Sequence, residues 1–176
     1  MHSTSLNSLI MVLLAATVFA CDASPAVRQV TSIPKEDWAK RQARISSPDS
    51  LLSGSTYLSS YSEIYTKSEN HTFSLTGTIS LRNVNLNDTI YIDEANYHKT
   101  SGLQVRTYFD APIFLAPMET VEIIITDDDI EGGTGDNFVF HWRKPPGTND
   151  PFFEGVFISV YGQQGISFAT SGIRIK

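Results

Sequence analysis

From Thr56 onward, apolar side chains recur at every second residue of the chain. In the segment 72–82 they alternate with serine, threonine and arginine, and Gly77 falls in the apolar series. Successive side chains of a strand face opposite ways, so this pattern predicts strands that bury one face. We expect Gly77 to leave room for a large neighbour. The same alternation predicts strands in further segments: 57–65, 89–97, 103–109, 121–125, 138–142, 156–160 and 166–173.

Turn-forming residues separate these predicted strands. Asparagine, glycine and proline gather at 85–88, 101–102, 116–118, 132–133, 145–147 and 162. Many short strands with frequent turns indicate a sandwich or a barrel. Two packed sheets can bury the aromatic faces of such strands, whereas one sheet facing water cannot. The turn at 115–120 is also similar to turns in bacterial immunoglobulin-like sandwiches. We therefore expect an all-β single domain over residues 54–176, an immunoglobulin-like antiparallel β-sandwich.

The N-terminus contains an apolar run that is typical of an export signal. Residues 9–19 carry no charge, and the run is too short to cross a bilayer, which takes about 20 residues. Ala20 precedes Cys21, and this order resembles the bacterial lipoprotein box, in which the cysteine is acylated and becomes the mature N-terminus. We expect a lipoprotein-type signal peptide over 1–20 and lipidation at Cys21. The alternative is a soluble secreted protein whose cysteine is incidental.

Residues 21–53 are rich in serine, proline and charge, which predicts a tether between the lipid and the domain. One short helix is expected within it. Pro34 suits a first helical position, and Glu36 precedes Lys40 in the order that complements the helix dipole. Trp38 among basic residues would suit lipid head groups, but a frayed linker helix is the simpler interpretation.

Composition and charge exclude some partners. The chain has 176 residues and a formal net charge of −6 at pH 7. Nucleic-acid-binding domains usually present a basic surface, so we expect no nucleic-acid partner. Cys21 is the single cysteine, so no internal disulfide can form.

An acidic turn is the sharpest candidate for a metal site. Asp127, Asp129 and Glu131 fall at alternate positions and are followed by glycine, a spacing that calcium loops use to converge several oxygens. However, Phe138 stands at position twelve of that register, where the bidentate acid is expected, and the flanking segments read as strands. The alternative is an acidic turn that blocks edge pairing. Asp136 would add a ligand if the loop folds back.

The sequence shows no arrangement of nucleophile and base that predicts catalysis. The histidines do not pair at metal-ligand spacing, and alternation turns His141 to the solvent side of its strand. Without a cysteine nucleophile or a recognisable serine elbow, we do not expect an enzyme. Trp142 falls in the apolar series and is expected in the core. Several aromatic residues are candidates for an outward, protein-facing surface, namely Tyr91, Tyr97, Tyr108, Phe157 and Tyr161.

Several short stretches together resemble one bacterial family. They are YSEIY at 61–65, FSLT at 73–76, SLRN at 80–83, GGTGDNF at 132–138, WR at 142–143 and GQQGISF at 162–168. The chain resembles domain of unknown function 3124 over roughly residues 54–174. The resemblance implies an exported β-domain, often with a lipoprotein-type signal, and supplies no activity.

These observations lead to two hypotheses of function. The first is a non-catalytic, membrane-tethered lipoprotein domain of the cell envelope, facing the periplasm or the cell surface, that binds another envelope protein or a small ligand. The alternative is a calcium- or cation-binding module that uses the turn from Asp127 to Glu131. Both hypotheses include the membrane as a partner through the N-terminal lipid.

Overall fold

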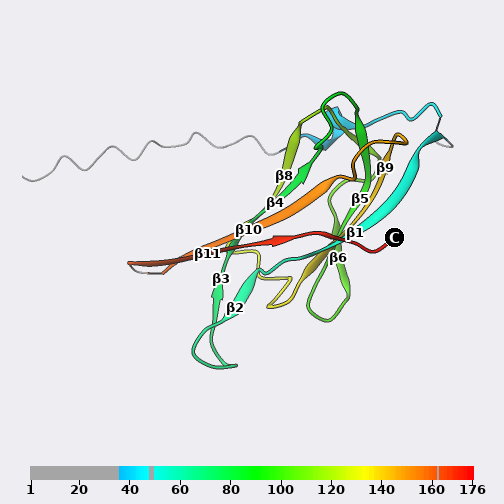
Figure 1. Ribbon diagram of the computed structural model, residues 1–176. Helices are drawn as coiled ribbons and strands as arrows, with labels where there is room; N and C mark the ends of the chain where they lie inside the picture. The colour runs from blue at the N-terminus through cyan, green and yellow to red at the C-terminus, as the bar shows by residue number, and fades with distance from the viewer. Residues whose placement is uncertain (1–35, 48–49, 162) are drawn as a thin grey trace, which may run out of the picture. The chain divides into compact units, whose positions relative to one another are not determined.

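The computed structural model describes residues 36–47, 50–161 and 163–176, and these form an all-β domain (Figure 1). The predicted antiparallel β-sandwich is confirmed. The strands are β1 (Leu52–Ser59), β2 (Glu63–Tyr65), β3 (Thr72–Ser74), β4 (Thr76–Arg82), β5 (Ile90–His98), β6 (Gln104–Thr107), β7 (Ile113–Leu115), β8 (Thr120–Ile125), β9 (Asn137–Lys144), β10 (Phe152–Tyr161), β11 (Gln164–Ser171) and β12 (Ile173–Arg174).

The strands form two main antiparallel sheets and one hairpin. The larger, six-stranded sheet has the order β12-β1-β9-β5-β6, with β7 also paired to β5. The smaller sheet has four strands in the order β11-β10-β4-β8, and β2 pairs with β3 in the hairpin. The chain passes from the smaller sheet to the larger one at Gly172, between β11 and β12.

Side-chain alternation builds the core between the two main sheets. In β9 every second residue is buried, and Phe138, Phe140 and Trp142 face inward. The ring of Phe140 stacks on that of Phe153 from β10, with centroids 4.1 Å apart, so the two sheets meet through aromatic rings. The prediction for Trp142 is confirmed, and its indole N–H donates to the Thr56 hydroxyl at 2.9 Å.

Gly77 makes room for an aromatic ring, as the sequence predicted. A Cβ placed there would lie 2.9 Å from Cε1 of Phe157, which β10 presents beside β4. The prediction that Phe157 and Tyr97 project outward was wrong, because both side chains are fully buried. Tyr97 instead packs on Phe138 of the adjacent strand, with ring centroids 4.8 Å apart.

Two predicted strands are each divided into two. The expected strand 57–65 breaks into β1 and β2, because Ser60 and Ser62 turn to bond with residues 133 and 136. The expected strand 72–82 breaks into β3 and β4 at Leu75, whose backbone N–H donates to the carbonyl of Ser62 at 2.9 Å.

The domain begins earlier than the predicted boundary at residue 54. The expected short helix is a four-residue 3-10 helix, η2 (Trp38–Arg41). The Trp38 ring lies 5.2 Å from that of Phe109, and Arg41 forms an ion pair with Glu119 at 2.8 Å. A ring contact and an ion pair thus attach Trp38 and Arg41 to the domain, although the sequence predicted that both belong to the tether. The predicted signal peptide, Cys21 and Pro34 lie outside the described residues.

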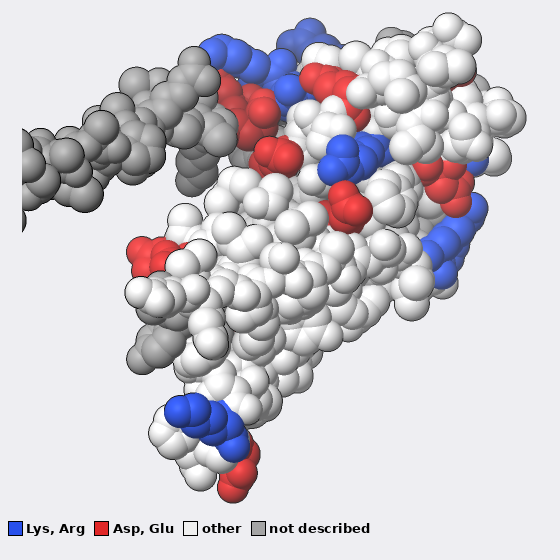
Figure 2. Space-filling view, turned by 60° about the vertical axis from the view of Figure 1, so that its left-hand side comes forward, with Lys and Arg blue, Asp and Glu red and all other residues white. Residues whose placement is uncertain are grey.

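Charged side chains are unevenly spread over the domain. In the view of Figure 2 they form a few separate groups, with a wide uncharged surface between them. Within the described part of the chain, no helix has the length and apolar character needed to cross a membrane.

Candidate functional site

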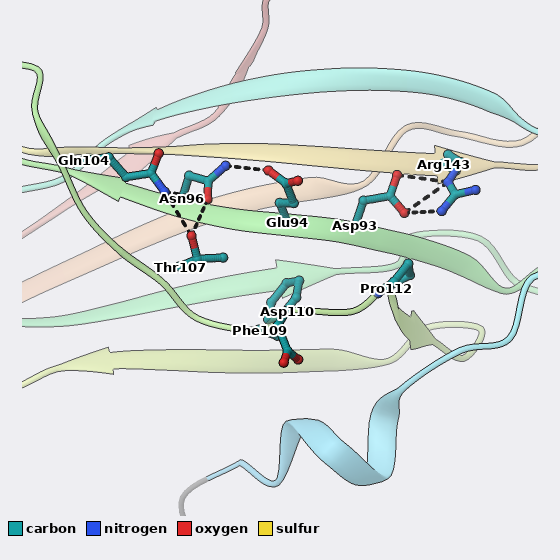
Figure 3. Close-up of a pocket in the computed structure, with 9 residues that line it drawn as sticks. All are labelled: Asp93, Glu94, Asn96, Gln104, Thr107, Phe109, Asp110, Pro112 and Arg143. Carbon is teal, nitrogen blue, oxygen red and sulfur yellow. Dashed lines mark hydrogen bonds and ion pairs between the residues drawn. The ribbon is translucent and has the colours of Figure 1, made fainter.

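A polar pocket with a volume of about 440 Å³ lies on the larger sheet (Figure 3). Its walls come from β5, β6, β9 and the segment between β6 and β7. The lining residues are Asp93, Glu94, Asn96, Gln104, Thr107, Phe109, Asp110, Pro112 and Arg143. Carboxylates, amides and a hydroxyl therefore gather at one place on the sheet.

A β-bulge in β5 creates this pocket's acidic wall. Ile92 pairs with Trp142 and Glu94 pairs with His141, so Asp93 is an extra residue without a partner in β9. Such bulges bend a strand and redirect its side chains. The carboxylate of Asp93 turns toward Arg143 and accepts three hydrogen bonds from the guanidinium, at 2.9 and 3.0 Å from Nε and at 2.5 Å from Nη2 (Figure 3).

Hydrogen bonds fix the opposite wall of the pocket. The side-chain oxygen of Asn96 accepts from the Thr107 hydroxyl at 2.8 Å and from the Gln104 amide at 3.2 Å. The Asn96 amide nitrogen donates to Glu94 at 2.7 Å. Because each group holds its neighbour, this wall is arranged before any ligand arrives.

The charges in the pocket favour some ligands over others. The lining contains three carboxylates and one guanidinium, and the charge of that guanidinium, Arg143, is neutralised by Asp93. Glu94 and Asp110 are exposed and have no cationic partner among the lining residues. The pocket therefore repels anions and suits neutral or cationic ligands that donate hydrogen bonds.

The acidic turn predicted as a metal site has a cationic partner within the protein. The Arg106 guanidinium donates to both carboxylate oxygens of Asp129, at 2.6 and 3.0 Å, and to Glu131 at 2.9 Å. Asp127 is exposed and takes no part in these contacts. Among the described residues, no three His, Cys, Asp or Glu side chains are placed to hold a metal ion. The calcium hypothesis stays a prediction.

Asp136, considered above as an added ligand, is buried and faces the interior. The Ser60 hydroxyl donates to one of its oxygens, and the backbone N–H of Ser62 donates to the other at 2.7 Å. The Ser62 hydroxyl also receives a hydrogen bond from the Gly133 N–H at 2.7 Å. This cluster fastens the connection between β1 and β2 to the loop before β9.

Burial governs the electrostatics of this cluster. It raises the pKa of Asp136, and hydrogen bonds from Ser60 and Ser62 offset part of the rise. Burial also raises the pKa of Tyr97, and the nearby charge of Asp136 adds to the effect. Gly132 leaves room for both groups, since a Cβ there would lie 1.9 Å from the Tyr97 hydroxyl and 2.4 Å from Asp136 Oδ2.

His141 has the orientation that alternation predicts. It is half-buried on the other side of β9 from the core aromatics, and its Nδ1 lies 2.8 Å from the Ser55 hydroxyl.

The sequence reasoning did not find the pocket, although one signal was present. The buried apolar residues of β5 are Ile90 and Ile92 at even positions, then Ala95 and Tyr97 at odd positions. A change of parity within one strand indicates an inserted residue, and the two acids at 93 and 94 lie at that change.

The fold and its pocket define a β-sandwich domain with an open, acid-lined pocket on its larger sheet. The chain belongs to the family of domain of unknown function 3124, whose model is described as a protein of unknown function and matches residues 53–175. This confirms the resemblance seen in the short stretches. No curated protein and no solved structure matches the chain.

Replacing Asp136 with Asn should change how stability depends on pH. The carboxyl group has a higher pKa in the folded chain than in the unfolded one, so its folded form keeps the proton longer. Its contribution to the free energy of unfolding therefore falls as pH rises from about 4 through the raised pKa. Asn has no proton to lose.

As pH rises across this window, we expect the free energy of unfolding of wild type to fall relative to that of Asp136→Asn. Denaturant titrations at a series of pH values measure this difference. The contributions of carboxyl groups that both proteins share cancel in it. A difference that stays constant from about pH 4 to about pH 8 would contradict a raised pKa.

Replacing Arg106 with Met tests the calcium hypothesis. The guanidinium occupies Asp129 and Glu131, and a calcium ion would have to displace it. We expect the variant to lose about 1 kcal/mol of stability, since these pairs are partly exposed. We also expect millimolar calcium to raise the melting temperature of the variant more than that of wild type. A shift in wild type as large as that in the variant would show that Arg106 does not compete with the ion.

Proposed function

We propose that this protein is a non-catalytic binding domain of the bacterial cell envelope, tethered to a membrane through a lipid on Cys21. The observation that carries the binding role is the pocket on the larger sheet, where a β-bulge and a bonded amide network hold polar groups in place. Rigid strands supply most of these groups, and ligand sites are usually preformed in this way.

The proposed ligand is small and polar, donates hydrogen bonds and carries no net negative charge. Glu94 and Asp110 supply carboxylate oxygens that no neighbouring cation neutralises within the pocket. Asn96 and Gln104 add amide groups that can accept or donate hydrogen bonds. Phe109 and Pro112 give an apolar side against which an aliphatic chain can lie. An aliphatic amine meets all of these requirements.

The sequence supports the membrane tether. The uncharged run at 9–19 is typical of a signal peptide, and Cys21 follows a small residue, as in the lipoprotein box. Stable anchorage takes more than one acyl chain, which the lipoprotein type of modification supplies.

Spermidine serves as a cationic probe of the pocket. We expect it to shift the backbone amide NMR signals of β5 and β6, and citrate at the same concentration to leave them in place. The double variant Glu94→Gln, Asp110→Asn should bind spermidine at least about tenfold more weakly, a loss of about 1.4 kcal/mol.

A chain with Glu69→Gln and Glu122→Gln is the matched control, because it also loses two exposed carboxylates, one from the turn between β2 and β3 and one from β8 in the other sheet. We expect this variant to bind spermidine as wild type does. Equal weakening in the control and in the double variant would show that spermidine responds to net charge alone. Displacement of spermidine by citrate would contradict the proposed ligand class.

Replacing Cys21 with Ala tests the tether separately from the pocket. Cells fed an alkyne-bearing fatty acid should label the wild-type chain and leave the Cys21→Ala chain unlabelled. The variant should also leave the membrane fraction. If Cys21→Ala is labelled as strongly as wild type, the lipid is not on this residue.

A further inference from the structure

One edge of the smaller sheet is long, uncharged and open. Strand β11 stands at the end of that sheet and pairs with β10 through eight residues, from Gln164 to Ser171. Within the described part of the chain no strand pairs with its other side. Its sequence, QGISFATS, contains neither a charged residue nor proline. Every second residue therefore presents an unpaired backbone N–H and C=O along this edge.

The other strands at the ends of the two main sheets carry charges, and β7, which pairs with β5 beside β6 and is uncharged, is only three residues long. Strand β8 contains Glu122, β6 contains Arg106, and β12 contains Arg174. Charges on edge strands prevent pairing with a further strand, and natural sheets use them for this purpose. Because β11 has no charged residue, it is the sheet end at which a further strand can pair.

The hairpin of β10 and β11 also projects beyond the rest of its sheet (Figure 1). Pairing of β10 with β4 ends at Ile158, whereas pairing with β11 continues to Tyr161. In the projecting part, Val160 is 78% exposed and Ile166 is 38% exposed. These two residues lie on opposite faces of the hairpin, because Val160 pairs with Gly165 and Ile166 pairs with Ser159. The projecting hairpin thus presents an exposed apolar side chain on each face.

We propose that β11 pairs antiparallel with β11 of a second copy of this chain, which joins two four-stranded sheets into one. A two-fold axis at Ser167 places Ser167 opposite its own counterpart and Ile166 opposite Phe168. This register keeps each residue on its own face, and it adds an aromatic-to-β-branched pair on either side of the axis.

The lack of charge along β11 makes this edge the suitable place for a second copy to pair. The chain carries a net charge of −6, so two copies repel each other over most approaches. Along β11 no charged side chain opposes contact, and the hydrogen-bonding groups of the two edges match under the two-fold axis. A charged peptide strand would gain no complementary charge there.

Disulfide crosslinking of the full chain in detergent tests this pairing. With Cys21→Ala as the background, Ser167→Cys carries the single thiol, and directly opposed strand residues lie within disulfide range. We expect mild oxidation to convert most of this variant to a covalent dimer. Glu122→Cys, on the opposite edge of the same sheet, should stay monomeric. Equal crosslinking of the two variants, or none at Ser167→Cys, would overturn the proposal.

Sedimentation equilibrium in density-matched detergent gives a second measurement. We expect wild type to have the mass of two chains, and Ser167→Asp to have the mass of one because two like charges then face each other. Thr120→Asp on β8 should remain dimeric. The Ser167 side chain is exposed, so this variant should melt as an intact domain. Wild type with the mass of one chain at all concentrations would overturn the proposal, whatever other protein binds the domain.

Discussion

The stacked rings of Phe140 and Phe153 join the two main sheets, and the rest of the domain depends on this contact. It requires β9 and β10 to present their aromatic residues toward each other in a fixed alternation. A shift of one residue in either strand would turn these rings to water. The neighbouring strands follow the same constraint, with glycines such as Gly54 and Gly77 placed where a ring of Trp142 or Phe157 needs the space.

Because the inner faces of the two sheets are filled by the core, only their outer faces, edges and irregularities are accessible to other molecules. The pocket uses an irregularity, because the extra residue Asp93 in β5 lets two consecutive acids line the same hollow. The proposed pairing of β11 with a second copy uses an edge. The buried carboxylate of Asp136 has another role, as it accepts hydrogen bonds from the β1–β2 connection and so holds one end of the sandwich together.

The sequence predicted the strands well because alternation is a local signal, and the parity of Phe138, Phe140 and Trp142 is enough to orient β9. It failed where long-range contacts override local pattern. Tyr97 has an ordinary strand environment in sequence, and only its packing on Phe138 makes it buried. For the pocket, the parity change beside Asp93 signals the bulge, but the meeting of Gln104 with Asn96 could not be predicted because it depends on how β5 and β6 pair. The contact of Arg106 with the acidic turn likewise joins residues distant in sequence.

Strand β1 has consequences for how the chain reaches its folded state. Its two neighbours in the larger sheet are β9 and β12, so the first strand of that sheet is completed by residues from the second half of the chain, as far as Arg174. Such non-local pairing is slow, because the entropy of closing a long loop is lost before the contacts between the strands can offset it. In a chain that emerges N-terminus first from a ribosome or a translocation pore, β1 would therefore lack one of its two partners until Ile173 and Arg174 are free.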